Sequence, residues 1–401
     1  MKVPPYYVFI ITLLIIGSST VAEGSVIDPE EKEKSSERLN FSEPKNLTQN
    51  KDDSVYPQVS SSSNSVYLVW QESVGSYGSR NYDIFFRQSN DGGDTFGSSI
   101  NLSNNPGFSE HPQIASVGNN IYVVWVDDSS GEREIMFSKS SDRGKTFTNS
   151  IVISQNSTDP NHVELAAEGQ SIYVVWNSFD TEMGNIILLS KSDNAGKTFG
   201  EIREIGTADN ETFPKIAANA GEYYVAWNKK NNKDTEVLFI KGHKDDNNTH
   251  NFANLSKLNN EAIDGGESQV TAFADRVLVS WTSNLPVDKK HVYIRNSSNN
   301  GNDFGNTIRL PSFNSSNVEN IIINGNTYVV WQDNINGNQD IFLTKTNING
   351  TSIDKPVNVS HNTGISECPS ITVSRNEIHM VWEDDTTGNH EVLYKRLSKF
   401  L

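Results

Sequence analysis

The sequence predicts an all-β protein of seven repeats, and three observations support this fold class. All seven tryptophans end a similar stretch, such as "VYLVW" or "IYVVW". Neighbouring tryptophans are 50 to 55 residues apart, a period typical of the four-stranded blade of a β-propeller. The last repeat lacks a final strand, whereas an orphan strand precedes the first repeat. The tryptophans are Trp70, Trp125, Trp176, Trp227, Trp281, Trp331 and Trp382.

Each repeat contains four segments with strand character. In the second repeat these are residues 112–116 ("PQIAS"), the stretch ending at Trp125, residues 133–140 ("REIMFSKS") and residues 150–154 ("SIVIS"). Val, Ile, Tyr and Phe favour β-strands, and no segment of helical length shows a 3.6-residue apolar period. The predicted fold is therefore a seven-bladed β-propeller of four-stranded antiparallel blades.

The two ends of the chain together supply one complete blade. The last repeat stops at Leu401 after three strands, and "SEPKNLTQN" (Ser42–Asn50) matches the fourth-strand segment "DKPVNVSHN" (Asp354–Asn362) of the repeat before it. We expect the N-terminal strand to complete the last blade and close the ring, because closure removes open sheet edges. The expected propeller domain spans residues 39–401.

The segment before the propeller has the features of an export signal. Residues 1–22 combine Lys2 with an apolar run and a small-residue end, "STVA", which is typical of a secretory signal peptide. An uncleaved membrane anchor is the alternative. Residues 23–38 carry mixed charges without apolar periodicity and are expected to form a disordered spacer. The sequence thus predicts a secreted or cell-surface protein, with no transmembrane span in the mature chain.

The charge and the cysteine content exclude some classes of protein. The formal net charge of −17 argues against nucleic-acid binding, which needs a basic surface. Cys368 is the only cysteine, so no internal disulfide stabilises the chain. We expect a monomer.

A short turn motif resembles that of a known superfamily. Four segments, "SNDGGDTF", "SSDRGKTF", "SDNAGKTF" and "SSNNGNDF", are similar to the Asp box, S-x-D-x-G-x-T-W/F, of sialidases and related BNR-repeat propellers. In this motif Asp or Asn accepts backbone N–H groups, Gly takes a positive φ and the aromatic residue points inward. The first three boxes contain Asp91, Gly93, Phe96, Asp142, Gly144, Phe147, Asn194, Gly196 and Phe199. The fourth has Asn299 and Asp303 in place of Asp and Thr.

The resemblance implies a fold more strongly than it implies an activity. Sialidases hold the substrate carboxylate with three arginines, use a Tyr–Glu nucleophile pair with an Asp acid/base, and usually have six blades and an R-I-P motif. No R-I-P motif is present, and only Arg80 and Arg133 fall in loops between second and third strands. The favoured prediction is therefore a binding module for a glycan or an extracellular protein and not an enzyme. The alternatives are an exo-α-sialidase-type glycoside hydrolase and a structural component of an extracellular coat.

Acidic residues recur in the loops between second and third strands, in the pattern W-x-[DE] followed by [DE]-[IV]. Three interpretations remain open: carboxylates that satisfy turn N–H groups, a Ca²⁺ site, or a binding surface for a cationic or polyhydroxyl partner. No cofactor other than Ca²⁺ is suggested. The candidate binding residues of these loops are Glu72, Asp83, Asp127, Asp128, Glu134, Asp333, Asp340, Asp384, Asp385 and Glu391, with Arg80 and Arg133.

Other repeated polar positions point to the axis and to the rim. His111, His162 and Cys368 share one position at the start of a first strand, where packing near the axis is expected. The predicted polar lining of the central channel is Gln58, Gln113, Glu164, Lys215, Gln269 and Glu319. Glycosylation sequons recur in fourth strands, at the rim, at Asn46, Asn101, Asn254 and Asn358.

Overall fold

The computed structural model describes residues 39–75, 81–155, 157–209, 212–231, 234–245, 255–260, 265–283, 290–335, 337–347 and 349–398. Every described strand belongs to the compact unit Asn40–Leu401. The expected signal peptide (1–22) and spacer (23–38) lie outside the described residues. In the described part of the chain, no helix has both the length and the hydrophobicity needed to cross a membrane.

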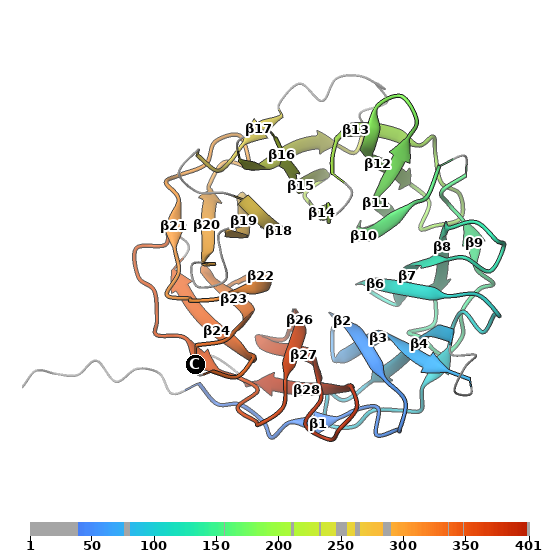
Figure 1. Cartoon of the computed structure of the whole chain (residues 1–401), viewed down its shortest axis with the longest axis horizontal. Coiled ribbons are helices and arrows are strands. Elements are labelled where there is room, and N and C mark those ends of the chain that lie inside the picture. Colours follow the sequence, from blue (N-terminus) through green and yellow to red (C-terminus); the bar gives the residue numbers. More distant parts are fainter. Residues whose placement is uncertain are drawn as a thin grey trace, which may run out of the picture. The chain divides into compact units, whose positions relative to one another are not determined.

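The unit Asn40–Leu401 is a ring of seven four-stranded antiparallel sheets, which confirms the predicted seven-bladed propeller. One strand of each blade lies nearest the axis, and the others follow outward (Figure 1). Blade 1 contains β2 (Ser54–Ser62), β3 (Ser65–Val74), β4 (Asn81–Ser89) and β5 (Ile100–Asn101). Blade 2 contains β6 (Ser109–Val117), β7 (Asn120–Asp127), β8 (Glu134–Ser140) and β9 (Ile151–Val152). Blade 3 contains β10 (Asn161–Glu168), β11 (Ser171–Asp180), β12 (Gly184–Ser192) and β13 (Arg203–Thr207).

The remaining blades repeat this order, and the last one takes its outer strand from the beginning of the chain. Blade 4 contains β14 (Lys215–Asn219), β15 (Glu222–Lys230), β16 (Thr235–His243) and β17 (Ser256–Lys257), and blade 5 contains β18 (Gly265–Phe273), β19 (Arg276–Ser283), β20 (Val292–Ser297) and β21 (Ile308–Arg309). Blade 6 contains β22 (Ser316–Ile323), β23 (Asn326–Asp333), β24 (Asp340–Asn347) and β25 (Val357–Asn358). Blade 7 contains β26 (Ser366–Ser374), β27 (Glu377–Asp384), β28 (Glu391–Leu397) and β1 (Lys45–Asn46).

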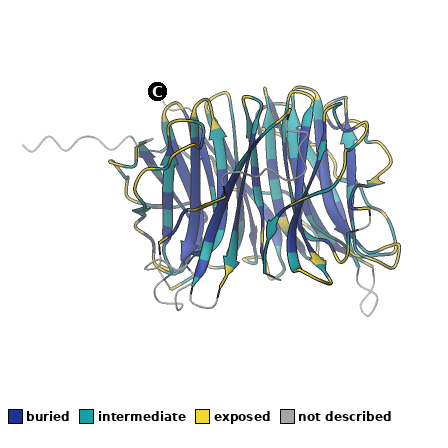
Figure 2. Cartoon of the chain, turned by 90° about the horizontal axis from the view of Figure 1, so that it is seen from above, coloured by how far each residue is buried: buried dark blue, intermediate teal, exposed yellow. Residues whose placement is uncertain are grey.

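The second strand of each blade is buried because neighbouring blades cover both of its faces. In β7, every residue after Asn120 is buried, and the seven tryptophans are at most 2% exposed. Figure 2 shows the buried strand interiors between two layers of exposed turns. We call the layer in which first strands begin and second strands end the loop face, and the opposite layer the Asp-box face. Ser109 at the start of β6 pairs with Asp127 at the end of β7, which places both on the loop face.

Ring closure by the N-terminal strand is confirmed. Lys45 and Asn46 of β1 pair with Tyr394 and Leu393 of β28. The buried side chain of Leu47 packs in one core cluster with residues of blades 1 and 7. Backbone hydrogen bonds extend the pairing on both sides, from Ser42 N to Arg396 O and from Leu47 N to Val392 O (both 2.8 Å).

Most fourth strands are shorter than the sequence suggested, with β13 the exception. Residues 150–154 were expected to form a strand, but only Ile151 and Val152 do so. The outermost strand pairs on one side only and has no second neighbour to keep it in register. A hydrogen bond from Ile153 N to Ile135 O (2.9 Å) continues the contact beyond the strand.

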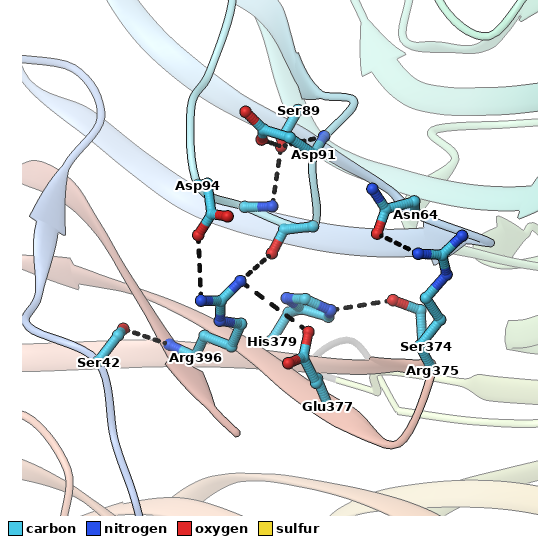
Figure 3. A network of polar contacts seen from close by, with 12 residues as sticks. Ser42, Asn64, Ser89, Asp91, Asp94, Ser374, Arg375, Glu377, His379 and Arg396 are labelled. Carbon is cyan, nitrogen blue, oxygen red and sulfur yellow. Dashed lines mark hydrogen bonds and ion pairs between the residues drawn. The ribbon is translucent and has the colours of Figure 1, made fainter. Parts of the chain in front are cut away.

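Polar side chains reinforce the joint between blades 7 and 1 on the Asp-box face (Figure 3). The Arg396 guanidinium pairs with Asp94 (3.0 Å) and donates to the Gly92 carbonyl (2.9 Å), so it connects β28 to the first Asp box. Arg375 of blade 7 donates to Asn64 of blade 1 (2.9 Å). These contacts strengthen the joint between blades 7 and 1, which no disulfide bond stabilises.

The Asp boxes also join neighbouring blades. The box aromatic of one blade packs edge-to-face on an aromatic residue in the third strand of the blade before it, at centroid distances of 4.8 to 5.0 Å. Each such pair contributes about 0.5–1.5 kcal/mol beyond the area that it buries. The pairs are Phe96–Tyr394, Phe147–Phe86, Phe199–Phe137 and Phe304–Phe239.

The fourth box departs from the motif without losing its hydrogen bond. In the first box, the Asp91 carboxylate accepts from the Thr95 hydroxyl (2.5 Å). In the box of blade 5, the Asn299 amide donates to the Asp303 carboxylate (3.0 Å). Donor and acceptor have exchanged positions, which explains why Asn and Asp replace Asp and Thr together.

Removing the closing strand should destabilise the whole ring. We expect deletion of residues 1–50 to lower the melting temperature by at least about 5 °C, because Leu47 leaves the core and β28 becomes an open edge. Deletion of residues 1–38 is the matched control and should leave the melting temperature unchanged. Equal melting temperatures for the two truncations in differential scanning calorimetry would contradict the closure.

Candidate functional site

The loop face opens at its centre into a cavity of about 380 Å³, lined by residues from all seven blades. One residue from each first strand, or from the turn just before it, surrounds the opening. We call this set the channel mouth. It consists of Tyr56, His111, His162, Phe213, Glu267, Asn317 and Cys368.

A β-bulge aims most of these side chains. In six of the first strands the pairing register shifts by one residue at the mouth, and bulges re-aim side chains in this way. Five mouth residues have φ between 48° and 52°, an uncommon conformation for residues other than glycine that costs about 1–3 kcal/mol each. They are Tyr56, His111, His162, Asn317 and Cys368.

A side chain from the preceding blade holds the strained backbone of four of these five residues. The Gln71 side chain accepts from His111 N (3.2 Å), and Gln332 accepts from Cys368 N (3.0 Å). The Tyr56 N–H donates to Glu383 (3.2 Å), and the Asn317 N–H donates to Glu267 (3.0 Å). The shape of the mouth therefore depends on contacts between blades.

Four neighbouring blades contribute a continuous aromatic arc. The ring centroids are 5.0 Å apart for Tyr56–His111, 5.7 Å for His111–His162 and 3.8 Å for His162–Phe213. Tyr56 and Phe213, at the two ends, are 41% and 36% exposed. The arc thus presents two solvent-accessible rings separated by two half-buried imidazoles.

Both imidazoles of the arc are uncharged at neutral pH. Burial lowers the pKa of His111. Burial, together with His111 and Arg133, lowers the pKa of His162 to about 4. The buried Nδ1 atoms of both rings have no hydrogen-bond partner within the described residues.

The other three blades contribute polar groups. Glu267, Asn317, Gln332, Glu367 and Cys368 line this side of the cavity. The Asn317 amide donates to Gln332 (2.6 Å), which fixes the position of both side chains. Burial raises the pKa of the Cys368 thiol, and the carboxylates of Glu383, Glu367 and Glu267 raise it further, so the thiol stays protonated.

A charged group lines the cavity two residues further along the first strands. Lys215 Nζ contacts Glu164 (2.9 Å) and Glu319 (3.3 Å), and Gln269 also donates to Glu319. Burial raises the pKa of Glu164 to about 6, although Lys215 opposes the shift. The predicted channel residues Gln58, Gln113, Glu164, Lys215 and Glu319 all line this cavity.

The W-x-[DE] carboxylates lie beneath the loops and hold the strands of their own blade together. In blade 2, Asp127 Oδ2 accepts from the Trp125 indole (3.0 Å), the Ser109 hydroxyl (2.7 Å) and the Asn105 amide (2.8 Å). Asp127 is 2% exposed. Glu72, Asp333 and Asp384 accept from the indole of their own blade in the same way.

The carboxylates that begin third strands bind the fourth strand of the same blade. Asp83 accepts from Asn101 (2.6 Å) and Ser103 (3.1 Å), and Asp340 accepts likewise from Asn358 and Ser360. Glu391 accepts from Thr48. In the sequons of Asn101 and Asn358 the N-x-S spacing therefore has a structural role, because both polar side chains bind one carboxylate.

The glycosylation sites stay a prediction, and the structure describes three of them. The amides of Asn101 and Asn358 are engaged as donors, whereas Asn46 accepts from the backbone of Thr48 and Gln49 (3.1 Å each). Asn254 lies outside the described residues.

The remaining candidate residues are dispersed over the loop face. Asp128 and Asp385 accept from backbone N–H groups of Phe108 and Ile365 (2.6 Å each). Arg133 donates to Glu110 (3.2 Å) and Asn161 (3.3 Å). Glu134 is half-buried at the start of β8, and Arg80 lies outside the described residues.

Neither a metal site nor an arginine clamp is assembled by the described residues. Among them, no group of three or more His, Cys, Asp or Glu side chains is arranged to hold a metal ion, and the Ca²⁺ site stays a prediction. The described residues that line the cavity include no arginine.

Several mouth residues were missed from the sequence, although a signal was present. His111 and His162 lie fourteen residues before the tryptophan of their blade. The same position is occupied in other blades by Tyr56, Phe213, Glu267 and Asn317. Their side chains differ from blade to blade, so a search for repeated residue types passes over them. Alignment on the tryptophans would have revealed the whole set.

Comparisons with known proteins support the fold. No protein-family model and no curated protein matches the sequence. A Dyadobacter fermentans protein of unknown function is 12% identical, with a TM-score of 0.57, over 90% of this chain and 99% of its own. The endosialidase of phage phi92 is 11% identical, with a TM-score of 0.54, over 90% of this chain and 70% of its own. A Trypanosoma rangeli sialidase is 13% identical, with a TM-score of 0.49, over 75% of this chain and 56% of its own.

These similarities place the chain among proteins with a sialidase-like β-propeller fold, as the Asp boxes suggested. Identities this low carry no information about activity. Within one fold, function depends on the residues of the site.

Substitution of a buried loop carboxylate should destabilise the fold. We expect Asp127→Asn to lower the free energy of unfolding by about 2–4 kcal/mol, because an amide nitrogen cannot accept from the three donors around Oδ2. Glu134→Gln, a half-buried control on the next strand, should change it by less than about 0.5 kcal/mol. Urea denaturation monitored by tryptophan fluorescence measures both, and a similar stability of the two variants would contradict the structural role of Asp127.

Proposed function

We propose that the protein is a glycan-binding module that holds its ligand at the channel mouth. The observation that carries this proposal is the arrangement of the cavity, with an aromatic arc on one side and hydrogen-bonding groups on the other. The C–H bonds of a sugar pack on the electron-rich faces of aromatic rings, while its hydroxyls need donors and acceptors. The volume of about 380 Å³ falls in the usual range of small-molecule sites, about 300–1,000 Å³.

The surroundings of the mouth support a binding face. Most of the large apolar side chains exposed on the described part of the chain lie on the loop face, and the Asp-box face carries Phe273. Exposed apolar groups concentrated on one face are typical of an interaction surface. Those of the loop face are Tyr56, Phe108, Phe179, Met183, Phe213, Phe313, Ile335 and Ile365.

The composition of the cavity favours binding over sialidase chemistry. A carboxylate-bearing sugar needs a bidentate guanidinium clamp, which lysine cannot replace. No arginine is among the described residues that line the cavity, and its single lysine is already bound to two carboxylates. The signal-like N-terminus supports export, so the proposed partner is an extracellular glycan.

A glycan array with matched variants tests this proposal. Wild-type protein should bind a defined set of glycans, and Tyr56→Ala or Phe213→Ala should weaken binding roughly tenfold or more, because each removes a stacking surface. Phe273→Ala, an exposed aromatic on the opposite face, should bind like wild type. Binding that survives both mouth substitutions would place the site elsewhere.

An activity assay separates the enzymatic alternative from the proposal. Incubation with a fluorogenic sialoside should give no turnover above the uncatalysed rate. Turnover that is abolished by Arg80→Ala or Arg133→Ala would overturn the proposal in favour of a sialidase-type hydrolase.

A further inference from the structure

The cavity at the channel mouth is lined by more negative than positive side chains. Four carboxylates line the cavity, those of Glu164, Glu267, Glu319 and Glu367, against the single ammonium of Lys215. The two histidines of the aromatic arc do not offset them, because both imidazoles are uncharged at neutral pH. A cleft lined by one sign of charge focuses its field on the ligand.

The excess charge lies on the polar side of the mouth. Lys215 is shared by Glu164 and Glu319, deep in the cavity. The Glu267 carboxylate accepts from the Asn317 backbone N–H (3.0 Å) and makes no ion pair with the described residues. The Glu367 carboxylate, on a strand residue paired with Glu383, has neither a hydrogen bond nor an ion pair within the described part of the chain.

A comparison between blades 2 and 7 shows that a carboxylate at the position of Glu367 can be paired within the protein. Glu110 occupies in blade 2 the position that Glu367 occupies in blade 7, and Glu110 is paired with Arg133 (3.2 Å). An unpaired carboxylate at the rim of a cavity is available to a cationic group of a ligand.

A buried hydroxyl next to Glu267 points to a missing partner. Ser268 lines the cavity and is 2% exposed, yet its Oγ atom has no hydrogen-bond partner among the described residues. Other blades have proline or valine here, such as Pro112, Val163 and Val318. An unsatisfied buried hydroxyl costs about 1–3 kcal/mol, a cost that a ligand donor would remove.

We propose that the ligand of the channel mouth is a saccharide with a protonated amine, an amino sugar without its N-acetyl group. Its ammonium lies near Glu267 and Glu367 and donates to Ser268, and its ring packs on the aromatic arc. The aromatic faces add to the selection, because they attract cations at their electron-rich surface. This inference rests on the proposed glycan-binding function and specifies which class of glycan is bound.

The same charge distribution excludes anionic sugars. A carboxylate-bearing sugar would meet Glu267 and Glu367 without a guanidinium to hold it, and like charges brought together cost several kcal/mol. The mouth is therefore the electrostatic opposite of a sialic-acid site, although the fold is sialidase-like.

Titration calorimetry with two tetrasaccharides of the same length tests the inference. A tetramer of β-1,4-linked glucosamine, at a pH where its amines are protonated, should bind at least about tenfold more tightly than its fully N-acetylated counterpart. Raising the salt concentration to about 0.5 M should weaken the first interaction and leave the second unchanged. Sialyllactose should not bind.

Matched variants identify the carboxylates. Glu367→Gln should reduce the affinity for the glucosamine tetramer roughly tenfold. The double variant with Glu267→Gln should reduce it further, because a second carboxylate is lost. The mouth should keep its shape in this variant, since a Gln oxygen can still accept from the Asn317 N–H. Glu204→Gln, an exposed control at the rim, removes the same charge and should have no effect. Melting temperatures of all variants check the fold.

The outcomes separate this inference from the proposed function. Equal or tighter binding of the N-acetylated tetramer would overturn the requirement for an amine while supporting glycan binding at the mouth. Wild-type affinity in the folded Glu367→Gln variant and in the double variant would also overturn it. Failure to bind either tetramer, together with an array that shows no glycan bound, would overturn both.

Discussion

A ring of seven sheets has no open edge when the last sheet is completed and packs against the first, and here β1 completes the last sheet. Its two paired residues are few, but Leu47 enters the core shared by blades 7 and 1, and Lys45 donates to two carbonyls of the first Asp box. The aromatic pair Phe96–Tyr394 repeats, at this joint, the contact that links other neighbouring blades. The joint between blades 7 and 1 therefore uses the same aromatic packing as the joints between other blades. It differs in that the outer strand of blade 7 comes from the N-terminal end of the chain.

The site inherits its geometry from this closure. The strained backbone at Tyr56 in blade 1 is held by Glu383 from blade 7, so the first and last blades must meet for the mouth to form. Most of the other strained positions are held by the blade before them, as His111 is by Gln71. First strands packed around an axis form a rigid scaffold, and a site built on rigid elements keeps its shape without a ligand.

The sequence was most informative where the blades are alike. The tryptophan spacing predicted the number of blades. The incomplete last repeat predicted closure by the N-terminal strand, because every blade is built from four strands. The W-x-[DE] carboxylates drew attention for the same reason, yet Asp127 and its equivalents are buried beneath the loops and accept the tryptophan indole. The mouth could not be found in this way. Apart from His111 and His162, its residues differ from blade to blade, and their convergence depends on bulges that a strand pattern does not reveal. In a ring of repeats, a constant polar residue is more often part of the frame, and a position that varies near the axis is the better candidate for a site.

If the channel mouth is the ligand site, a crystal of the protein soaked with an oligosaccharide that it binds should show the sugar there. We expect density for a sugar ring in the cavity, against Phe213 or Tyr56 and within hydrogen-bond distance of the polar side. Density on the rim or on the Asp-box face, with the mouth empty in the same crystal, would contradict it.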